Sequence, residues 1–457
     1  MEKTFHVILK PLRRFAVQKP NASLLLFVAT ILAMLLANSP FADKYQQFLL
    51  HPIELQAGNF SFFAHHGEPM TLLAFVNDAL MAVFFFTIGL EIKQEVLIGE
   101  LCSFRKALLP IIAACGGMVI PVLFYLLVCP SGSAASGAAI PMATDIAFAL
   151  AVLGLLGNKV PLSLRIFLTA LAVVDDIGGI IIIALFYSGE IAFQPLLISL
   201  ALLLVLYLGG KMKIYNRLFY YVLGFCVWML FLESGIHPTI AGVLVAFTVP
   251  ARPKLHLDCF RRDMGEYLEM LDASEAKCSN KATVLNSRQI HVLNNIHTLA
   301  NHTISPLQTI TDKLHPFVSY VILPLFAFVN AGVTFGDINP ASIINVPLAV
   351  FLGLVVGKTM GIFSFSYISI KSGLISMPKG MNIKNLFAVS ALGGIGFTVA
   401  LFIANLSFDA TTPEGMDLLN QAKLGVFSGS FISGLIGYFA LRKYLTNPVE
   451  QTEDLSE

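Results

Sequence analysis

Two adjacent aspartates, Asp175 and Asp176, lie in the middle of the apolar stretch 162–187. Elsewhere an Asp-Asp pair would be interpreted as a helix cap or a surface loop, but the residues on both sides of this pair are largely apolar. A charged side chain at the centre of a membrane helix costs at least ~2.5–3.5 kcal/mol, so such residues are rare and mostly functional. The pair is therefore the first candidate for a functional site.

Two further charged residues interrupt apolar stretches. Asp145 follows Thr144 within 133–155, and Lys358 is at the middle of 347–370. Carboxylates held at one depth in a membrane repel each other and resist ionising together, and one ammonium group nearby relieves that repulsion. We expect these charged residues to share one site with the aspartate pair.

The chemistry that such a cluster supports is a competition between ions. Burial and like-charged neighbours both favour the protonated form of a carboxyl group. Sodium is a hard cation, and hard cations bind oxygen ligands from carboxylates, hydroxyls and carbonyls. The same carboxylates can therefore hold a proton or a sodium ion. A site of this kind that is exposed first to one side of a membrane and then to the other exchanges the two ions.

The whole chain has the composition of a membrane protein. Of its 457 residues, 56% are hydrophobic and 12% are charged, which is about half the charged fraction of an ordinary soluble domain. A helix needs about 20 apolar residues to cross the hydrocarbon core. The sequence predicts an all-α polytopic membrane protein in a lipid bilayer, with about 12 transmembrane helices at 22–38, 72–92, 107–128, 133–155, 162–187, 193–209, 218–232, 235–250, 306–330, 347–370, 383–405 and 418–441.

Net charge and cysteine usage exclude several other classes. The formal net charge is only +1, so nothing indicates a nucleic-acid partner. The 6 cysteines include no C-x-x-C pair, which argues against a disulfide framework and against a zinc site. No cofactor is expected.

Lysine and arginine set the expected orientation. With the spans above, all of the 29 basic residues except Lys44, Lys358 and Lys423 fall on one side of the membrane. By the positive-inside rule that side is cytoplasmic, so both termini are expected there. The polar stretch 251–305 is interpreted as a cytoplasmic insertion with a short helical excursion. It separates the transporter segments 1–250, with spans one to eight, and 306–457, with spans nine to twelve.

Two predicted spans contain helix-breaking residues at their centres. One is broken at Pro141, just before Asp145, and the other at a run of glycines made of Gly393, Gly394 and Gly396. Proline removes a helical hydrogen bond and glycine weakens a helix, so two discontinuous helices are expected. The first broken helix is the middle one of spans three to five, and the second is the middle one of spans ten to twelve. These triplets start on opposite sides of the membrane and so form inverted repeats, whose paired broken helices indicate a transporter's ion site.

Long stretches around these residues resemble the NhaA family of sodium–proton antiporters, over essentially the whole chain outside 251–305. NhaA is itself an example of a transporter with inverted repeats, so the repeat and the resemblance are not independent. The matching segments are 76–81, 88–91, 139–150, 170–187, 235–243, 314–333 and 393–398. The resemblance implies a secondary active transporter, not an enzyme, in the bacterial inner membrane. It would move sodium or lithium out in exchange for protons by alternating access, for pH and sodium homeostasis, and a homodimer is the expected assembly.

The resemblance also implies a role for each residue of the site. Asp176 would be the main ligand of the transported sodium ion and the proton carrier. Asp175 would be its partner as a metal ligand and would pair with Lys358 when the ion is absent. Thr144 and Asp145 would support the cation site where the two broken helices cross, together with the glycines of the second break.

Four residues are expected further from the centre. The resemblance places Glu91 and Glu95 at the cytoplasmic entrance with a part in pH activation, and gives His237 a part in the pH response. The competing interpretation is that charges at helix ends and a loop histidine are commonplace. Asp78 lies 13 residues before Glu91, about 20 Å along a helix, so it belongs nearer the outer side in a supporting place.

The chain departs from the family pattern at two places. Gln94 stands where family members often have a basic residue, and the stretch 305–311 is neutral where they have a charged cluster. Transport is expected to survive these changes, whereas pH sensing of the family's kind is left open.

Three other functions fit the sequence less well. A sodium-coupled symporter would need a substrate pocket that the sequence does not obviously supply. An intramembrane aspartyl protease would need two aspartates that face each other across a water, usually from different helices, and Asp175 and Asp176 are adjacent. A channel would need a continuous polar stripe, which is not found.

Overall fold

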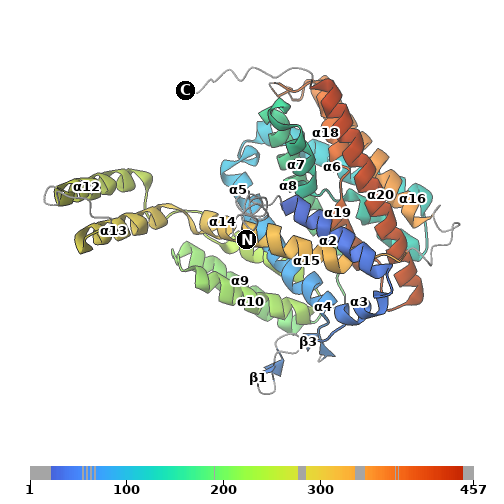
Figure 1. Cartoon of the computed structure of the whole chain (residues 1–457), viewed down its shortest axis with the longest axis horizontal. Helices are drawn as coiled ribbons and strands as arrows, with labels where there is room; N and C mark the ends of the chain where they lie inside the picture. The colour runs from blue at the N-terminus through green and yellow to red at the C-terminus, as the bar shows by residue number, and fades with distance from the viewer. Residues whose placement is uncertain are drawn as a thin grey trace, which may run out of the picture.

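The computed structural model describes residues 22–53, 56–57, 60–61, 64–65, 68–189, 191–275, 285–334, 345–375, 377–378 and 380–445. These residues are almost entirely helical, which confirms the predicted fold class. The described strands are four of two residues each, paired antiparallel as β1 (Gln56–Ala57) with β2 (Phe60–Ser61) and β3 (Ala64–His65) with β4 (Glu68–Pro69). Figure 1 shows β1 and β3 beyond one end of the helix bundle.

The α-helices pack into one bundle from which one hairpin projects (Figure 1). Their bounds are α2 Ala22–Ala37, α3 Ala42–Leu49, α4 Leu72–Ala74, α5 Met81–Ile98, α6 Phe104–Val128, α7 Ile146–Leu155, α8 Leu162–Phe186, α9 Phe193–Lys211, α10 Arg217–Ser234, α11 Pro238–Thr248, α12 Leu257–Glu275, α13 Ser287–Thr303, α14 Pro306–Phe317, α15 Leu323–Asn330, α16 Val346–Leu352, α17 Thr359–Lys371, α18 Ile383–Leu392, α19 Phe397–Ser407 and α20 Pro413–Tyr444.

Shorter turns of other helix types join some of these helices. Among the described residues, the 3₁₀-helices are η2 (Glu100–Cys102), η3 (Ser133–Met142) and η4 (Gly157–Lys159). The described π-helices, each of which continues a longer span, are η1 (Phe75–Leu80), η5 (Val318–Ile322) and η7 (Gly353–Lys358). Wide π turns inside α-helices are rare and are frequent at functional sites. Lys358 is the last residue of one of them.

The predicted count of twelve spans is not confirmed. In the described part of the chain, 8 helices are long and apolar enough to cross a membrane, and up to 11 if each bent pair is one span. The remaining prediction, 235–250, coincides with α11, which has 11 residues. A helix of that length reaches about 17 Å, short of the ~30 Å hydrocarbon core.

Both predicted breaks are present. The chain bends by 44° between η3 and α7, and by 47° between α18 and α19. A third bend, of 118°, separates α2 from α3. The first break follows Pro141 and the second contains the glycine run, so the helix-breaking residues are where the backbone turns.

The described part of the insertion forms two helices, longer than the short helical excursion expected from the sequence. Its two helices, α12 and α13, lie against each other and project from the bundle beyond α14 (Figure 1). The chain enters and leaves the hairpin at one place, because the backbone nitrogens of Lys254 and Leu255 both donate to the carbonyl oxygen of His302, at 3.0 and 2.9 Å. Just below, the backbone nitrogen of Leu307 donates to the carbonyl oxygen of Pro250 at 3.2 Å.

Close packing of α6 against α17 fixes the position of Lys358. Gly116 on α6 and Gly361 on α17 touch through their backbones, and a Cβ added to either would meet the carbonyl oxygen of the other. A Cβ on Gly117 would lie 2.8 Å from Ile362 and 3.7 Å from the Lys358 side chain. Small residues at this contact therefore let α17 approach α6 closely enough to bury the lysine.

Candidate functional site

The two broken helices meet at Asp145. Its backbone nitrogen donates a hydrogen bond to the carbonyl oxygen of Ile395, at 2.6 Å, in the break between α18 and α19. Its side-chain Oδ2 accepts hydrogen bonds from the backbone nitrogen and the hydroxyl of Thr398, at 3.1 and 2.6 Å. Its Oδ1 accepts from the backbone nitrogen of Phe148 at 3.1 Å. One carboxylate therefore holds the first turns of α7 and α19 together.

The start of α19 is held by a second side chain. The backbone nitrogens of Gly396 and Phe397 each donate to the hydroxyl of Ser430 on α20, at 3.2 Å. A helix begins with N–H groups that have no partner inside the helix, and these carry partial positive charge. Gly394 packs tightly against α20, because a Cβ there would lie 2.6 Å from the hydroxyl of Ser433. The break between α18 and α19 is therefore held in place by contacts with α20.

Asp175 and Lys358 form a buried ion pair. The Lys358 ammonium group contacts Oδ2 of Asp175 and the carbonyl oxygen of Met142 at the end of η3. The hydroxyl of Thr144 is 2.5 Å from the same carboxylate oxygen and 3.0 Å from the carbonyl oxygen of Gly393. Oδ1 of Asp175 has no hydrogen-bond partner in the described part of the chain. The structure thus brings together Thr144, Asp175 and Lys358.

Asp176 faces a different direction from its neighbour. It lines a cavity of about 260 Å³, named here the Asp176 cavity. The other polar groups of this lining include Thr87, Glu91, Thr144, Asp145, Ser319 and Thr398. Among the described residues no group donates a hydrogen bond to the Asp176 carboxylate. It is therefore a carboxylate that is 6% exposed, faces a cavity with several oxygen-bearing side chains in its lining and is free to accept a ligand.

The two glutamates expected at the entrance differ in their surroundings. Glu91 lines the Asp176 cavity. Glu95, one turn later on α5, uses Oε2 to accept a hydrogen bond from the backbone nitrogen of Glu100 at 3.0 Å. Glu95 is therefore engaged in the turn that ends α5, and the structure does not bring its side chain into the cavity.

Asp78 and His237 lie together in a second cavity, of about 630 Å³, named here the Asp78 cavity. The His237 Nε2 atom is 3.8 Å from Oδ1 of Asp78, and its Nδ1 atom is 2.8 Å from the hydroxyl of Thr239. Tyr187, just beyond the end of α8, lines the same cavity. The structure therefore groups His237 with Asp78 and not with Glu91.

Several residues that hold this region were not found from the sequence. Thr398 and Ser430 secure the second break, and an amide network joins three helices. The Asn330 side chain exchanges hydrogen bonds with Asn77, at 2.8 and 3.2 Å, and accepts one from Asn405 at 2.8 Å. Uncharged polar residues in apolar helices often bond their own backbone, so the sequence offered no signal for these contacts.

The arrangement suits a monovalent hard cation that competes with a proton. The Asp176 cavity offers carboxylate and hydroxyl oxygens, the ligands that hard cations prefer. Over the residues that the structure describes, no group of three or more His, Cys, Asp or Glu side chains has a metal-binding arrangement. Oδ2 of Asp175 is engaged by Lys358, so that oxygen becomes available to a cation only when the lysine moves away.

Comparison with known proteins also indicates a sodium–proton antiporter. The family described as Na⁺/H⁺ antiporter 1 matches residues 13–441. A protein of Parabacteroides distasonis named Na(+)/H(+) antiporter NhaA is 74% identical over 455 residues, which is 100% of both chains. Proteins of the same name from Porphyromonas gingivalis and Bacteroides thetaiotaomicron are 52% and 53% identical, over 97% and 95% of this chain and 97% and 98% of their own.

Proposed function

The chain belongs to the Na⁺/H⁺ antiporter 1 family, and from this premise we propose that it exchanges sodium for protons with Asp176 as the group that both ions share. The observation that carries the proposal is the contrast between two adjacent aspartates. Asp175 is paired with Lys358, whereas Asp176 faces a cavity and accepts no hydrogen bond from any described residue. The protein is a multi-pass membrane transporter, and this free carboxylate is its exchange site.

Exchange follows from competition at one carboxyl group. In the proton-loaded form Asp176 carries a hydrogen on one oxygen. A sodium ion that enters the Asp176 cavity binds the carboxylate, and the O–H bond breaks with release of the proton to water. Thr144 and Asp145 line the same cavity and supply further oxygens. Because the two ions need the same oxygen atoms, each binding event excludes the other, and this exclusion couples their opposite movements.

The positive charge of Lys358 stabilises the site when no sodium ion is bound. Two adjacent carboxylates in a low-dielectric interior repel each other strongly, and the ammonium group beside Asp175 offsets that repulsion. When sodium binds, the cation takes over the role of the lysine, so Asp175 becomes a second ligand. The exchange is driven by the ion gradients alone, which makes the chain a secondary active transporter.

The broken helices give the site its mobility. Asp145 ties the start of α7 to the start of α19 by hydrogen bonds, so these two half-helices move as a unit. The irregular backbone of the breaks is buried in protein or lines the cavity, where such backbone is tolerated within a membrane. Small rotations of this unit are the proposed step that exposes Asp176 alternately to the two sides.

We infer the orientation from basic residues at helix ends. Lys211 ends α9, Lys371 ends α17, and Arg442 and Lys443 lie in the last turn of α20. The positive-inside rule assigns these ends to the cytoplasm of a bacterial inner membrane. Sodium is then exported and protons enter. Lithium, another hard cation, is accepted by the same oxygens.

The two alternatives have less support. The carboxylates of Asp175 and Asp176 have different partners, so they do not form the facing pair that an aspartyl protease needs. A symporter needs a pocket for an organic solute next to the sodium site, and the Asp176 cavity, at about 260 Å³, is smaller than the roughly 300–1,000 Å³ of typical ligand pockets.

The test is sodium-driven collapse of a preset pH gradient in proteoliposomes. The native chain is compared with Asp176→Asn and with the matched control Asp263→Asn, at a position on the projecting helix α12. Sodium is expected to collapse the gradient with the native chain and with Asp263→Asn, and to have no effect with Asp176→Asn. Exchange by Asp176→Asn at the native rate would refute the site, and no response of the native chain to sodium or lithium would refute the function.

A further inference from the structure

A further cavity lies where α6 and α8 begin. Its volume is about 660 Å³, and it is named here the Arg105 pocket. The first turns of both helices line it, together with Leu374 and Pro378 from the connection between α17 and α18. None of its lining residues lines the Asp176 cavity or the Asp78 cavity. The proposed ion exchange therefore makes no use of this pocket.

The lining of the Arg105 pocket carries a net positive charge. Arg105 and Lys106 are both exposed, and neither forms an ion pair with a carboxylate in the described part of the chain. Glu100 is the one acidic residue among the described residues of the lining. Two positive charges against one negative charge favour an anionic ligand, and both basic side chains are available to it.

The helix starts at this pocket also favour an anion. Neither α6 nor α8 is capped by the side chain of the preceding residue. The first N–H groups of a helix have no partner inside it and attract negative charge. Ser163, in the first turn of α8, lines the pocket, and its hydroxyl oxygen is buried without a hydrogen-bond partner in the described part of the chain. Buried polar groups nearly always have a partner, so this hydroxyl indicates a ligand that can form a hydrogen bond.

Most of the remaining lining is apolar. Leu109, Phe167 and Ala170 are buried, whereas Phe104 and Leu374 are 77% and 65% exposed. Apolar and aromatic side chains at the end of a membrane helix lie at the boundary between acyl chains and headgroups. A small free anion would leave this apolar surface uncovered, whereas a phospholipid covers it with an acyl chain.

We propose that the Arg105 pocket binds one anionic phospholipid of the cytoplasmic leaflet. The pocket follows the end of α17 at Lys371, one of the basic helix ends assigned to the cytoplasm above, and basic pockets between helices on that side bind anionic headgroups. The lipid phosphate accepts a hydrogen bond from Ser163 and is attracted by Arg105 and Lys106. A zwitterionic lipid is held less well, because its own ammonium group offsets that attraction. The inference uses the orientation given under the proposed function, but it does not depend on ion exchange.

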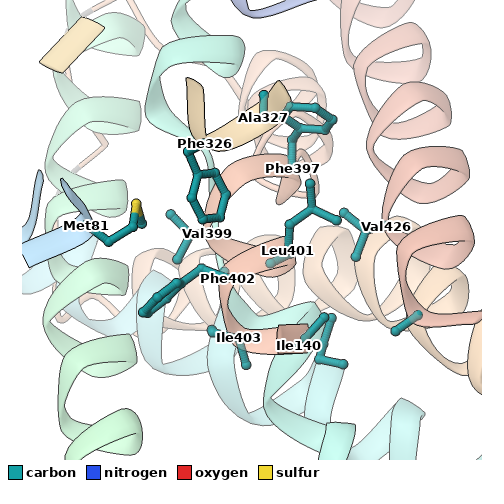
Figure 2. Packing of buried hydrophobic residues seen from close by; sticks show 14 of the residues in the cluster. Met81, Ile140, Phe326, Ala327, Phe397, Val399, Leu401, Phe402, Ile403 and Val426 are labelled. Carbon is teal, nitrogen blue, oxygen red and sulfur yellow. The ribbon is translucent and has the colours of Figure 1, made fainter. Parts of the chain in front are cut away.

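The wall of the pocket is continuous with the core around α18. Leu109 and Phe167 belong to one buried cluster with Leu392, the last residue of α18. The second half of this broken helix, α19, is packed in a different cluster, in which Figure 2 shows Phe397 and Leu401. A lipid in the pocket therefore stabilises the α18 side of the break, and its binding is expected to raise the melting temperature of the protein.

The first test measures this melting temperature for the full chain in a non-ionic detergent. Short-chain phosphatidylglycerol is titrated in, and phosphatidylcholine with the same chains is the zwitterionic comparison. We expect a saturable rise with phosphatidylglycerol and a much smaller one with phosphatidylcholine. The double variant Arg105→Gln/Lys106→Gln is expected to need on the order of tenfold more phosphatidylglycerol for half of the rise. Equal responses of the native chain to the two lipids would overturn the proposal.

The matched control removes two basic residues elsewhere on the same side. Arg442 and Lys443 are exposed in the last turn of α20 and do not line the pocket. Arg442→Gln/Lys443→Gln is expected to respond to phosphatidylglycerol as the native chain does. Equal losses in the two double variants would show a general effect of surface charge and would contradict a site. Arg105→Gln alone, expected to give part of the loss, is used if its double variant does not fold.

A second variant tests the hydrogen bond. Ser163→Ala is expected to lower the melting temperature more in the presence of phosphatidylglycerol than in its absence, because the hydroxyl has a partner only in the lipid complex. The control is Ser369→Ala, whose buried hydroxyl bonds the carbonyl oxygen of Ser366 in its own helix. This control is expected to have the same effect with and without lipid. An effect of Ser163→Ala that does not depend on the lipid would contradict the proposed contact.

Inorganic phosphate distinguishes a lipid headgroup from a free anion. Potassium phosphate is compared with potassium chloride at equal ionic strength, and it is expected to stabilise the native chain less than phosphatidylglycerol does. If phosphate stabilises the chain as much as the lipid and Arg105→Gln/Lys106→Gln removes that effect, the pocket is a site for a free anion and the lipid proposal is wrong.

The outcomes separate this proposal from the proposed function. Loss of lipid selectivity contradicts the lipid site while sodium-driven exchange by the native chain remains intact. Failure of the native chain to exchange sodium for protons contradicts the proposed function, and the lipid titrations still report whether the Arg105 pocket is occupied.

Discussion

Asp145 begins α7, yet it accepts two hydrogen bonds from Thr398 in the first turn of α19, one from the backbone nitrogen at 3.1 Å and one from the hydroxyl at 2.6 Å. A single carboxylate therefore satisfies the starts of two half-helices that are far apart in the sequence. Both helix ends carry partial positive charge, so the side-chain oxygens of Asp145 interact favourably with both of them. Because Asp145 also lines the Asp176 cavity, the shape of that cavity depends on this junction.

Removal of the Thr398 hydroxyl is expected to weaken this junction. Thr398→Val keeps the side-chain shape and the backbone bond but loses the 2.6 Å hydrogen bond to Asp145. A typical hydrogen bond contributes about 0.5–1.5 kcal/mol, so the melting temperature in detergent is expected to fall and the sodium KM to rise. The matched control is Thr311→Val, whose hydroxyl bonds only Leu307 of its own helix. Equal effects of the two substitutions would contradict a special role for the junction.

Loss of Lys358 is expected to be more damaging than loss of the whole ion pair. Lys358→Met leaves Asp175 buried beside Asp176 without a cation, and removing one partner of a buried pair costs about 3–5 kcal/mol. Lys358→Met combined with Asp175→Asn removes both charges and is expected to recover most of the melting temperature but not the exchange. The measurement is a double-mutant comparison of thermal stability. A double variant no more stable than Lys358→Met would show that repulsion is not the cause.

Proton competition sets the direction of the pH dependence. If both ions bind Asp176, a higher proton concentration on the side where sodium enters raises the sodium KM and leaves the maximal rate unchanged at saturating sodium. Initial rates of sodium uptake into proteoliposomes, measured over a range of external pH, check this. A maximal rate that falls with pH at a constant KM would indicate that protons bind elsewhere.

The loop before α20 supplies a pH effect away from the transport site. The backbone nitrogen and the hydroxyl of Thr411 donate to Asp409, at 2.9 and 2.7 Å, and these bonds lower the pKa of that carboxyl group. A lowered pKa gives stability that is present above the pKa of the unfolded chain and is lost as the pH falls through the folded pKa. The melting-temperature difference between the native chain and Asp409→Ala is therefore expected at neutral pH and to shrink in acid. A difference that is constant with pH would exclude the carboxylate as its origin.

The sequence predicted the charged centre of the site because charge is rare in apolar helices. Asp145, Asp175 and Lys358 stood out for that reason, and the structure brings the last two together as an ion pair. The breaks were predictable because proline and glycine have local backbone effects. Thr398, Ser430 and the amide network were not, because the same residue types commonly bond their own helix and only the tertiary packing shows which ones do not.

The surroundings of His237 illustrate a second limit. The resemblance gave His237 a part in the pH response, and only the fold shows that it lies beside Asp78. The number of membrane crossings also depends on the fold, because α11 is too short to count by length alone.

The hairpin of α12 and α13 leaves and rejoins the bundle at one point, with its two ends bonded to each other (Figure 1). This geometry makes the hairpin useful for aligning images of single particles. A membrane protein enclosed in detergent offers few outside features by which single particles can be aligned, and this one carries an asymmetric landmark of its own. A soluble domain fused within the hairpin would enlarge this landmark without changing the helices that form the ion site.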